Sequence, residues 1–416
     1  MPTTRVPSVF RLGLLLAGFA LGLASTARAE DTVKIAYIDP LSGAFADVGD
    51  VGLKHFQYMA ARVNAAGGVA GGKKLEIVGF DDKTTPSEAV TQFQKAADQG
   101  IRYITQGNGS SVAAALIDAV EKHNARNPDA RVVFLNYAAV DPAFTNDKCS
   151  FWHFRFDADA DMKMDALTEW LRARPDIKKV YILGQDYTFG KAVAAAAVRM
   201  IAAKRPDIEL VGNELHPLGK VKDFSPYVAK MKGSGAQAVI TGNWGTDMTL
   251  LIKASSDAGF NVPYLTYYGG GLGAPTAMGQ SAVGLVKQIS EFHLNVEGLN
   301  NDALIDDFAK TANTDLYYFR VKTLVDMLAR AMNEANSTDT FKVASALEGM
   351  VQKTGIGDAT MRKDNHQLLQ TMFVSTFSEG TKHPVERGTF GFKTDMRIEA
   401  DKTATQTTCK MQRPEK

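Results

Sequence analysis

The sequence contains little cysteine and has no excess of charge of either sign. Two cysteines in 416 residues exclude a disulfide-rich scaffold and a zinc ribbon. Lysine and arginine number 47 against 46 acidic residues, without a long basic run, which excludes nucleic acid as a partner because phosphate binding depends on clustered basic side chains. With 45% hydrophobic residues, the chain is long enough for two lobes with buried cores.

Signals for metal binding and for catalysis are also missing. The seven histidines never pair at the spacing of metal ligands, and a metal site needs at least two that converge. No G-x-S-x-G elbow occurs, and neither cysteine lies beside a histidine. We therefore expect no metal, no cofactor and no enzymatic activity. The alternative is an exported α/β enzyme such as a hydrolase, which would need a nucleophile with a base in reach.

The first 29 residues are typical of an export signal. Arg5 and Arg11 precede an uncharged, largely apolar run over residues 12–24, and Ala27-Arg28-Ala29 matches the pattern that signal peptidase cleaves. The run is too short to cross a bilayer as a stable helix, and no later segment approaches ~20 uninterrupted apolar residues. We predict that residues 1–29 are a signal peptide and that the mature protein is a monomer in the periplasm. A membrane anchor is the alternative for this leader.

Beyond the leader, short β-branched runs alternate with helical patterns. The alternation begins at Val33 and restarts after Trp152, so the expected fold class is α/β, with mostly parallel sheets flanked by helices. So many strands are more economical in two lobes than in one sheet. The expected strands lie at 33–38, 75–80, 101–105, 131–135, 180–183, 208–215, 238–241, 264–267, 286–294 and 371–377. The expected helices lie at 87–99, 110–123, 188–204, 223–232, 246–259, 300–312 and 316–335, after a first one around residues 53–63.

The late helices have no strands of their own, so we expect them to return to the first lobe. The predicted first lobe therefore comprises residues 30–155 and 291–365. The predicted second lobe comprises residues 156–290 and 366–416. Several parallel crossings would join the two lobes.

One turn has the features of an anion site. Gly107-Asn108-Gly109-Ser110-Ser111-Val112 follows an expected strand and opens an expected helix, where free N–H groups and the positive end of the helix dipole converge. Val112 stands where a dinucleotide fingerprint requires a third Gly or Ala, so that motif is excluded. The alternative is an ordinary turn with a helix cap.

Aromatic residues follow several expected strands. In open α/β sheets ligands bind beyond the carboxyl ends of strands, so these rings are candidates to line one cleft. Core packing is the alternative for any single ring. The rings are Phe45, Phe189, Trp244, Tyr267 and Tyr268.

The two cysteines, Cys149 and Cys409, would both enter an oxidising compartment. We predict a disulfide between them that ties the C-terminal tail to the link between the lobes. Two separate free thiols are the alternative.

An ordered set of motifs resembles one known family. The set comprises Ile38-Asp39-Pro40-Leu41-Ser42-Gly43, Val63-Asn64-Ala65-Ala66-Gly67-Gly68, Asp81-Asp82 and Asp186-Tyr187-Thr188-Phe189-Gly190. It resembles the periplasmic substrate-binding proteins of branched-chain amino acid ABC importers, the leucine-binding-protein-like family, over nearly all of residues 33–400. The resemblance implies a type I two-lobed clamshell with three hinge crossings. It also implies a solute bound between the lobes and delivery to an inner-membrane ABC permease.

The resemblance also implies site residues. Its carboxylate-binding serine falls on Ser110, and its next binding segment falls on Ala138-Ala139-Val140, where a Thr would be usual. Aromatic positions fall on Phe189 and Trp244, and a first-loop Tyr falls on Val48. Ser111, Phe45, Tyr268 and Gly269 complete the predicted ligand-binding set.

The acidic residue that should meet a ligand ammonium falls near Gly269, where this sequence has no acid. A buried ammonium without a partner would cost several kcal/mol. Either Asp141 or Asp247 replaces it, or the solute carries no ammonium. The predicted solute is therefore a branched-chain or related amino acid, or a small aromatic or aliphatic carboxylate. A ligand sensor on the same fold is a further alternative to an importer component.

Overall fold

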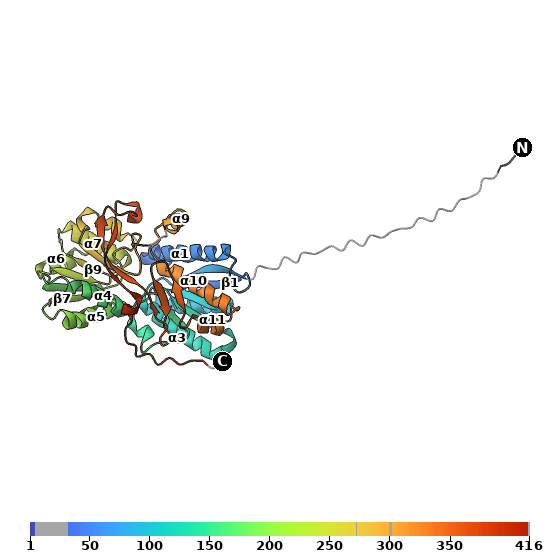
Figure 1. Ribbon diagram of the computed structural model, residues 1–416, viewed down its shortest axis with the longest axis horizontal. Coiled ribbons are helices and arrows are strands. Elements are labelled where there is room, and N and C mark those ends of the chain that lie inside the picture. The colour runs from blue at the N-terminus through green and yellow to red at the C-terminus, as the bar shows by residue number, and fades with distance from the viewer. Residues whose placement is uncertain (5–31, 272, 299–301, 415–416) are drawn as a thin grey trace. The chain divides into compact units, whose positions relative to one another are not determined.

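The computed structural model describes residues 1–4, 32–271, 273–298 and 302–414 (Figure 1). The predicted signal peptide lies almost entirely outside these residues. Among the helices of the described ranges, none has the length and apolar character that a membrane span requires.

Five parallel strands form the first sheet, in the order β2-β1-β3-β4-β5. The expected strands at 33–38, 75–80, 101–105 and 131–135 all fall in this sheet, and only its last, short strand was not predicted. The strands are β1 Thr32–Asp39, β2 Lys74–Asp81, β3 Tyr103–Gln106, β4 Val133–Asn136 and β5 His153–Arg155, connected in part by α1 Ala46–Ala65, α2 Pro86–Asp98 and α3 Ser110–Arg126.

Seven strands form the second sheet, in the order β15-β14-β10-β9-β8-β6-β7. The pairs β10·β14 and β14·β15 are antiparallel and the others are parallel. The strands are β6 Lys179–Gln185, β7 Glu209–His216, β8 Ala238–Thr241, β9 Tyr264–Thr266, β10 Val286–Ser290, β14 Met372–Glu379 and β15 Phe390–Ile398, with helices α4 Ala160–Arg172, α5 Thr188–Lys204, α6 Ser225–Gly233, α7 Gly245–Asp257 and α8 Ala274–Met278. The predicted class, two mostly parallel sheets flanked by helices, is confirmed. Strand β15 and helices α4 and α8 were not predicted.

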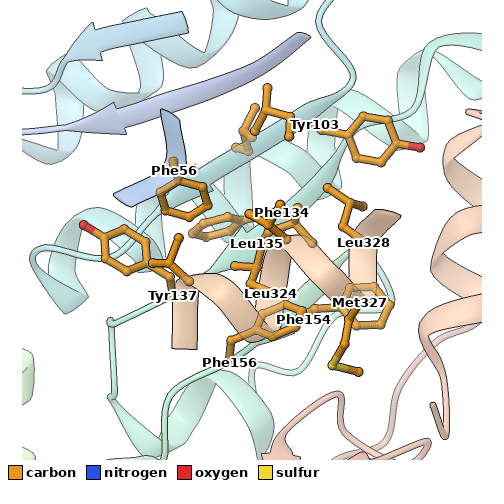
Figure 2. Packing of buried hydrophobic residues seen from close by; sticks show 14 of the residues in the cluster. Phe56, Tyr103, Phe134, Leu135, Tyr137, Phe154, Phe156, Leu324, Met327 and Leu328 are labelled. Carbon is orange, nitrogen blue, oxygen red and sulfur yellow. The ribbon is translucent and has the colours of Figure 1, made fainter. Parts of the chain in front are cut away.

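The late helices return to the first sheet, as the pattern indicated. Buried side chains of α10, including Leu324 and Leu328, belong to one core with Phe56 of α1 and Phe134 of β4 (Figure 2). Helix α10 packs against α1 and α11, and Figure 1 shows α10 beside α1 although the two are far apart in sequence. The late helices are α9 Asp302–Ala312, α10 Phe319–Glu334 and α11 Thr340–Leu347, followed by the small antiparallel sheet β11 Val351–Lys353, β12 Asp358–Met361 and β13 Leu368–Leu369.

Two segments that connect the sheets lie side by side. The N–H of Arg155 donates to the carbonyl of His366 at 2.9 Å, and the side chain of Gln370 donates to the carbonyl of Phe156 at 2.9 Å. The chain leaves the first sheet after β5 and returns to the second through β14, so these bonds join the first and last connections.

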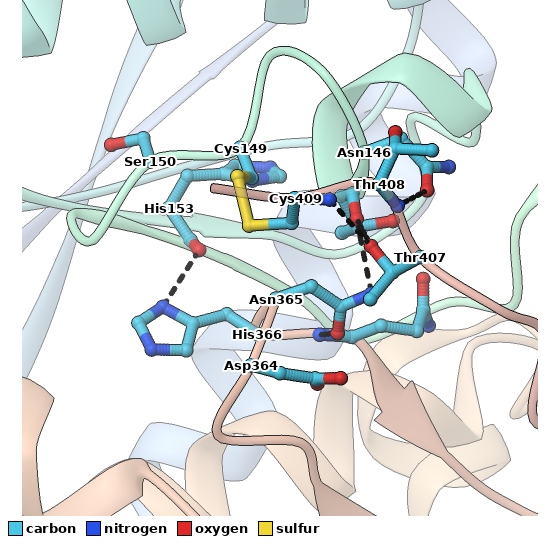
Figure 3. The surroundings of a disulfide bond; sticks show 12 residues. Asn146, Cys149, Ser150, His153, Asp364, Asn365, His366, Thr407, Thr408 and Cys409 are labelled. Atoms are coloured by element: carbon cyan, nitrogen blue, oxygen red, sulfur yellow. Dashed lines mark hydrogen bonds between the residues drawn. A yellow bond between two sulfur atoms is a disulfide. The ribbon is translucent and has the colours of Figure 1, made fainter. Parts of the chain in front are cut away.

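Cys149 and Cys409 form a disulfide that spans 260 residues (Figure 3). Beside it, the Thr407 hydroxyl donates to the carbonyl of Thr145 at 2.7 Å, and the N–H of Thr408 donates to Asn146 at 3.1 Å. The C-terminal tail therefore lies against the segment before β5. The lobe boundaries at 155/156, 290/291 and 365/366 stay a prediction.

Candidate functional site

The turn between β3 and α3 is held from behind by Asp39. One Asp39 oxygen accepts the N–H of Asn108 at 2.8 Å and that of Gly107 at 3.4 Å, and the other accepts the Tyr137 hydroxyl at 2.8 Å. Burial raises the pKa of Asp39 to about 6, although these hydrogen bonds oppose the shift. Gly109 has a φ of 104°, which favours glycine. The turn is therefore fixed before any solute arrives.

Ser110 begins α3 and has 2% of its surface exposed. Within the described residues its hydroxyl has no hydrogen-bond partner, and the first N–H groups of a helix have none within the helix. The N-terminus of this 17-residue helix also carries the positive end of its dipole. Donors thus converge where the sequence predicted a carboxylate.

The second sheet contributes a wall of aromatic rings. Tyr187 and Phe189 follow β6, Trp244 follows β8, and Tyr268 follows β9. The indole N–H of Trp244 donates to the Tyr187 hydroxyl at 2.7 Å, and the rings of Phe189 and Tyr268 are 6.0 Å apart. These strand ends share one edge of the sheet, as expected for parallel strands.

Both walls meet in one cavity of about 40 Å³. It brings together the predicted residues Val48, Ser110, Ala138, Ala139, Val140, Phe189, Trp244 and Tyr268. A neighbouring cavity of about 450 Å³ shares Val48, Tyr317 and Tyr318 with it and offers room that the smaller cavity lacks. The smaller cavity alone is far below the usual size of a ligand pocket, so a solute needs space beyond it.

Three predicted residues are not on the cavity wall. Phe45 stacks on Trp244 instead, with ring centroids 4.2 Å apart. The hydroxyl of Ser111 lies 3.3 Å from that of Thr188 at the start of α5. The N–H of Gly269 donates to the Thr266 hydroxyl at 3.0 Å, which turns this residue away, and Gly271 lines the cavity in its place.

Neither aspartate considered for a solute ammonium lies on this wall. Asp141 accepts the N–H of Ala143 at 3.0 Å and caps the short helix that follows. Asp247 is fully buried and accepts from Gln185 and from the N–H of Gly219, both at 2.8 Å. No Asp or Glu is among the described residues that line the smaller cavity.

The Ala138–Val140 segment also differs from the role that the resemblance implied. The N–H groups of Ala138 and Ala139 both donate to the side chain of Asn136, at 3.2 and 2.8 Å. These donors are occupied, so the segment presents mainly apolar side chains to the cavity.

Among the wall residues that were not predicted as ligand contacts, four have large side chains. Tyr187 belongs to the motif at residues 186–190 that carries the family resemblance, but within this motif only Phe189 was predicted as a ligand contact. Tyr317, Tyr318 and Arg320 come from the connection into α10 and from its start, well beyond Gly269, the last predicted site residue. The signal for these residues in the sequence is Tyr317-Tyr318, followed closely by Arg320, at the start of the expected helix over residues 316–335.

No cluster of three or more potential metal-ligating side chains occurs in the part of the chain that the structure describes. The wall of the smaller cavity consists of a helix N-terminus, aromatic rings, small apolar side chains and one arginine, a combination that suits a small organic anion with an apolar body.

Comparison with known proteins bears on this site. Residues 32–382 match the family described as periplasmic binding protein. The chain belongs to the periplasmic binding protein family. This periplasmic binding protein is 30% identical over 413 residues to the Leu/Ile/Val-binding protein homolog 4 of Brucella abortus, covering 97% of this chain and 98% of that one. The resemblance that the motifs indicated is therefore confirmed.

Two further relatives agree. The leucine-, isoleucine-, valine-, threonine-, and alanine-binding protein of Pseudomonas aeruginosa is 27% identical over 355 residues, covering 84% of this periplasmic binding protein and 91% of that chain. A crystal structure of the protein of that name from Brucella ovis, in its closed conformation, superposes with a TM-score of 0.82 at 29% identity. It covers 92% of this chain and 100% of that chain.

Proposed function

We propose that this periplasmic binding protein collects a small organic acid and delivers it to an ABC permease in the inner membrane. The solute is a branched-chain or related amino acid, or a small aromatic or aliphatic carboxylate. Two relatives that are named for the binding of leucine, isoleucine and valine support this class of solute.

One observation carries the proposal. A single cavity joins the N-terminus of α3, with the unpartnered Ser110 hydroxyl, to the rings of Phe189, Trp244 and Tyr268 from the other sheet. Charge-assisted hydrogen bonds to the carboxylate contribute about 1.5–3 kcal/mol each. The rings cover the apolar body of the solute and exclude water.

Contacts between the two walls indicate how the solute is enclosed. Phe45 stacks on Trp244, and the Thr246 hydroxyl donates to the carbonyl of Ala44 at 2.8 Å. The hydroxyls of Ser111 at the start of α3 and Thr188 at the start of α5, 3.3 Å apart, also join the two walls. In this proposal the lobes close as a hinge, these contacts form on closure, and the empty protein loses them.

The proposal includes the location and state of the protein. Residues 1–29 are removed on export, and the mature protein is a periplasmic monomer with the predicted lobes 30–155 plus 291–365 and 156–290 plus 366–416. The intact mass and the sedimentation of the exported protein test these points. A retained leader or a stable dimer would contradict them.

A thermal-shift screen with amino acids and organic acids, followed by calorimetry and a turnover assay, tests the function. A solute at 100 times its Kd should raise the unfolding free energy by about 2.7 kcal/mol. The solute should be recovered unchanged. Turnover would favour the hydrolase alternative, and the absence of any stabilising amino or organic acid would contradict the proposal.

A further inference from the structure

Arg320 lies on the wall of the smaller cavity with 2% of its surface exposed. It is the second residue of α10. The guanidinium carbon of Arg320 lies 4.8 Å from the centroid of the Tyr318 ring, over its face. Nε donates to the carbonyl of Tyr137 at 2.7 Å. Nη1 donates to both oxygens of Glu291, at 2.7 and 2.8 Å. These bonds fix the plane of the guanidinium.

The remaining nitrogen, Nη2, is buried and has no hydrogen-bond partner within the described residues. Arginine presents five donors in a rigid fork, and leaving a buried charged donor unsatisfied is costly. The other two nitrogens are held by protein atoms, so Nη2 is the one nitrogen of Arg320 without an acceptor among the described residues.

A second buried arginine, Arg155, has structural contacts only and serves as a comparison for Arg320. Arg155 is 0% exposed and does not line this cavity. Its Nε donates to Gln367, its Nη1 to the carbonyl of Asp141, and its Nη2 to Thr145 and Asp159. Every nitrogen has a protein acceptor, unlike Nη2 of Arg320.

The charged groups behind Arg320 are already paired with one another. Lys163 donates to Asp157 at 2.7 Å, and Asp157 lies 3.5 Å from Nε of Arg320. With Glu291 the cluster holds two cations and two carboxylates, so its charges already balance. Only Arg320 of these four reaches the cavity wall, so a solute group placed there meets an N–H donor.

We propose that Nη2 of Arg320 donates to an oxygen of the bound solute, so that the solute carries an oxygen acceptor in addition to the carboxylate held at Ser110. A keto, hydroxyl or second carboxylate oxygen fills this role. An ammonium group does not. This inference rests on the proposed function and narrows its solute class to oxygenated organic acids.

The test compares matched solutes by calorimetry with the full mature protein. One series is isocaproate, α-ketoisocaproate, α-hydroxyisocaproate and leucine, and a second is benzoate and terephthalate, which places the second oxygen farther away. An oxygenated member of at least one series should bind about tenfold or more tightly than its parent acid. Leucine should not exceed isocaproate. The series that shows the preference locates the acceptor.

Arg320→Lys keeps the charge that Glu291 needs and removes the forked donor. It should reduce the preference for the oxygenated solute to less than about threefold while the parent acid loses little affinity. Arg155→Lys is the matched control, and it should lower the melting temperature without changing the preference. If Arg320→Lys does not fold, the pair Arg320→Gln with Glu291→Gln removes the ion pair without leaving a lone buried charge.

The outcomes separate the two claims. A wild-type protein that binds no organic or amino acid overturns the proposed function. A wild-type protein that binds acids, with an oxygen preference that is absent or that survives Arg320→Lys, overturns only the role of Arg320. A leucine preference of tenfold or more, lost with Asp157→Asn, would also overturn it and would assign the ammonium to the unpartnered Asp157 oxygen.

Discussion

The two walls of the cavity are built from different chemistry although both lie at the carboxyl ends of parallel strands. The side of the first sheet contributes hydrogen-bond donors, from the start of α3 and from Arg320 of α10, together with the rings of Tyr317 and Tyr318. The second sheet contributes Tyr187, Phe189, Trp244 and Tyr268. In the proposed function, this difference separates two tasks: one wall recognises the charged group of the solute, and the other covers its apolar body.

The two walls are also supported differently. Behind the polar wall, Asp39 and Tyr137 fix the turn through buried hydrogen bonds. The aromatic wall is fixed by ring packing and by the bond from Trp244 to Tyr187. Loss of a donor should therefore affect every carboxylate, whereas loss of a ring should depend on the shape of the solute.

The largest expected effect leaves both walls intact. Replacing Cys149 and Cys409 with alanine removes a link across 260 residues and should lower the free energy of unfolding by about 2–4 kcal/mol. Urea denaturation measures this loss. Solute affinity should change by less than about twofold, because the disulfide lies away from the cavity residues. Unchanged stability, or two titratable thiols in the untreated protein, would refute the link.

Ser110→Ala tests the polar wall. It should weaken the binding of every carboxylate by about 1–3 kcal/mol, roughly five- to a hundredfold, because part of a buried charge loses its donor. Isothermal calorimetry measures the affinity. Ser111→Ala is the matched control, and it should cost less because Ser111 contacts Thr188 and not the cavity. Equal effects of the two variants would contradict the assignment.

Trp244→Ala tests the aromatic wall. It should weaken aromatic solutes more than aliphatic ones by about 0.5–1.5 kcal/mol, because stacking is lost as well as buried area. Phe45→Ala is the comparison, since Phe45 stacks on Trp244 from outside the cavity wall. Phe45→Ala should weaken both solute types alike. A solute-independent effect of Trp244→Ala would remove the distinction between the two walls.

The last prediction concerns the pH dependence of stability rather than solute binding. Burial raises the pKa of Asp82 to about 8 and that of Asp39 to about 6. The folded protein then keeps these protons while the unfolded chain loses them near pH 4, so stability should fall as the pH rises from about 4 to 8. In Asp82→Asn the decline between pH 6 and 8 should be shallower. Denaturation at several pH values measures the slope, and identical slopes would contradict the shift.

Much of the fold could be predicted because its signals are local. Alternating β-branched runs and helical stripes placed nearly all strands of the first sheet and the return of the late helices. Strand β15 was missed because it pairs antiparallel with β14 at the edge of the second sheet, and its outer residues are polar. The small sheet β11–β13 was missed because its strands have only two to four residues.

The site could be predicted where a residue occupies a recognisable position at the start of a helix or the end of a strand. Ser110 stands at a helix start, and Phe189 and Trp244 follow strands, so local pattern placed them correctly on the wall. Arg320 and Tyr317 reach the cavity only through the packing of α10 on the first sheet, which no local pattern reports. Phe45 and Gly269 also follow strands, as Trp244 does. However, Phe45 stacks on Trp244 and Gly269 donates to the Thr266 hydroxyl, and neither residue lines the cavity.

The central claim is that the smaller cavity recognises a carboxylate and presents no described Asp or Glu to an ammonium. Asp315 and Glu386 line the neighbouring, larger cavity instead. Calorimetry with an amino acid and its des-amino analogue, leucine against isocaproate and phenylalanine against hydrocinnamate, tests it most directly. The des-amino acid should bind at least as tightly as the amino acid, within about threefold, since none of the described residues that line the smaller cavity is an Asp or Glu. A tenfold or greater advantage of the amino acid, about 1.4 kcal/mol, would contradict the account.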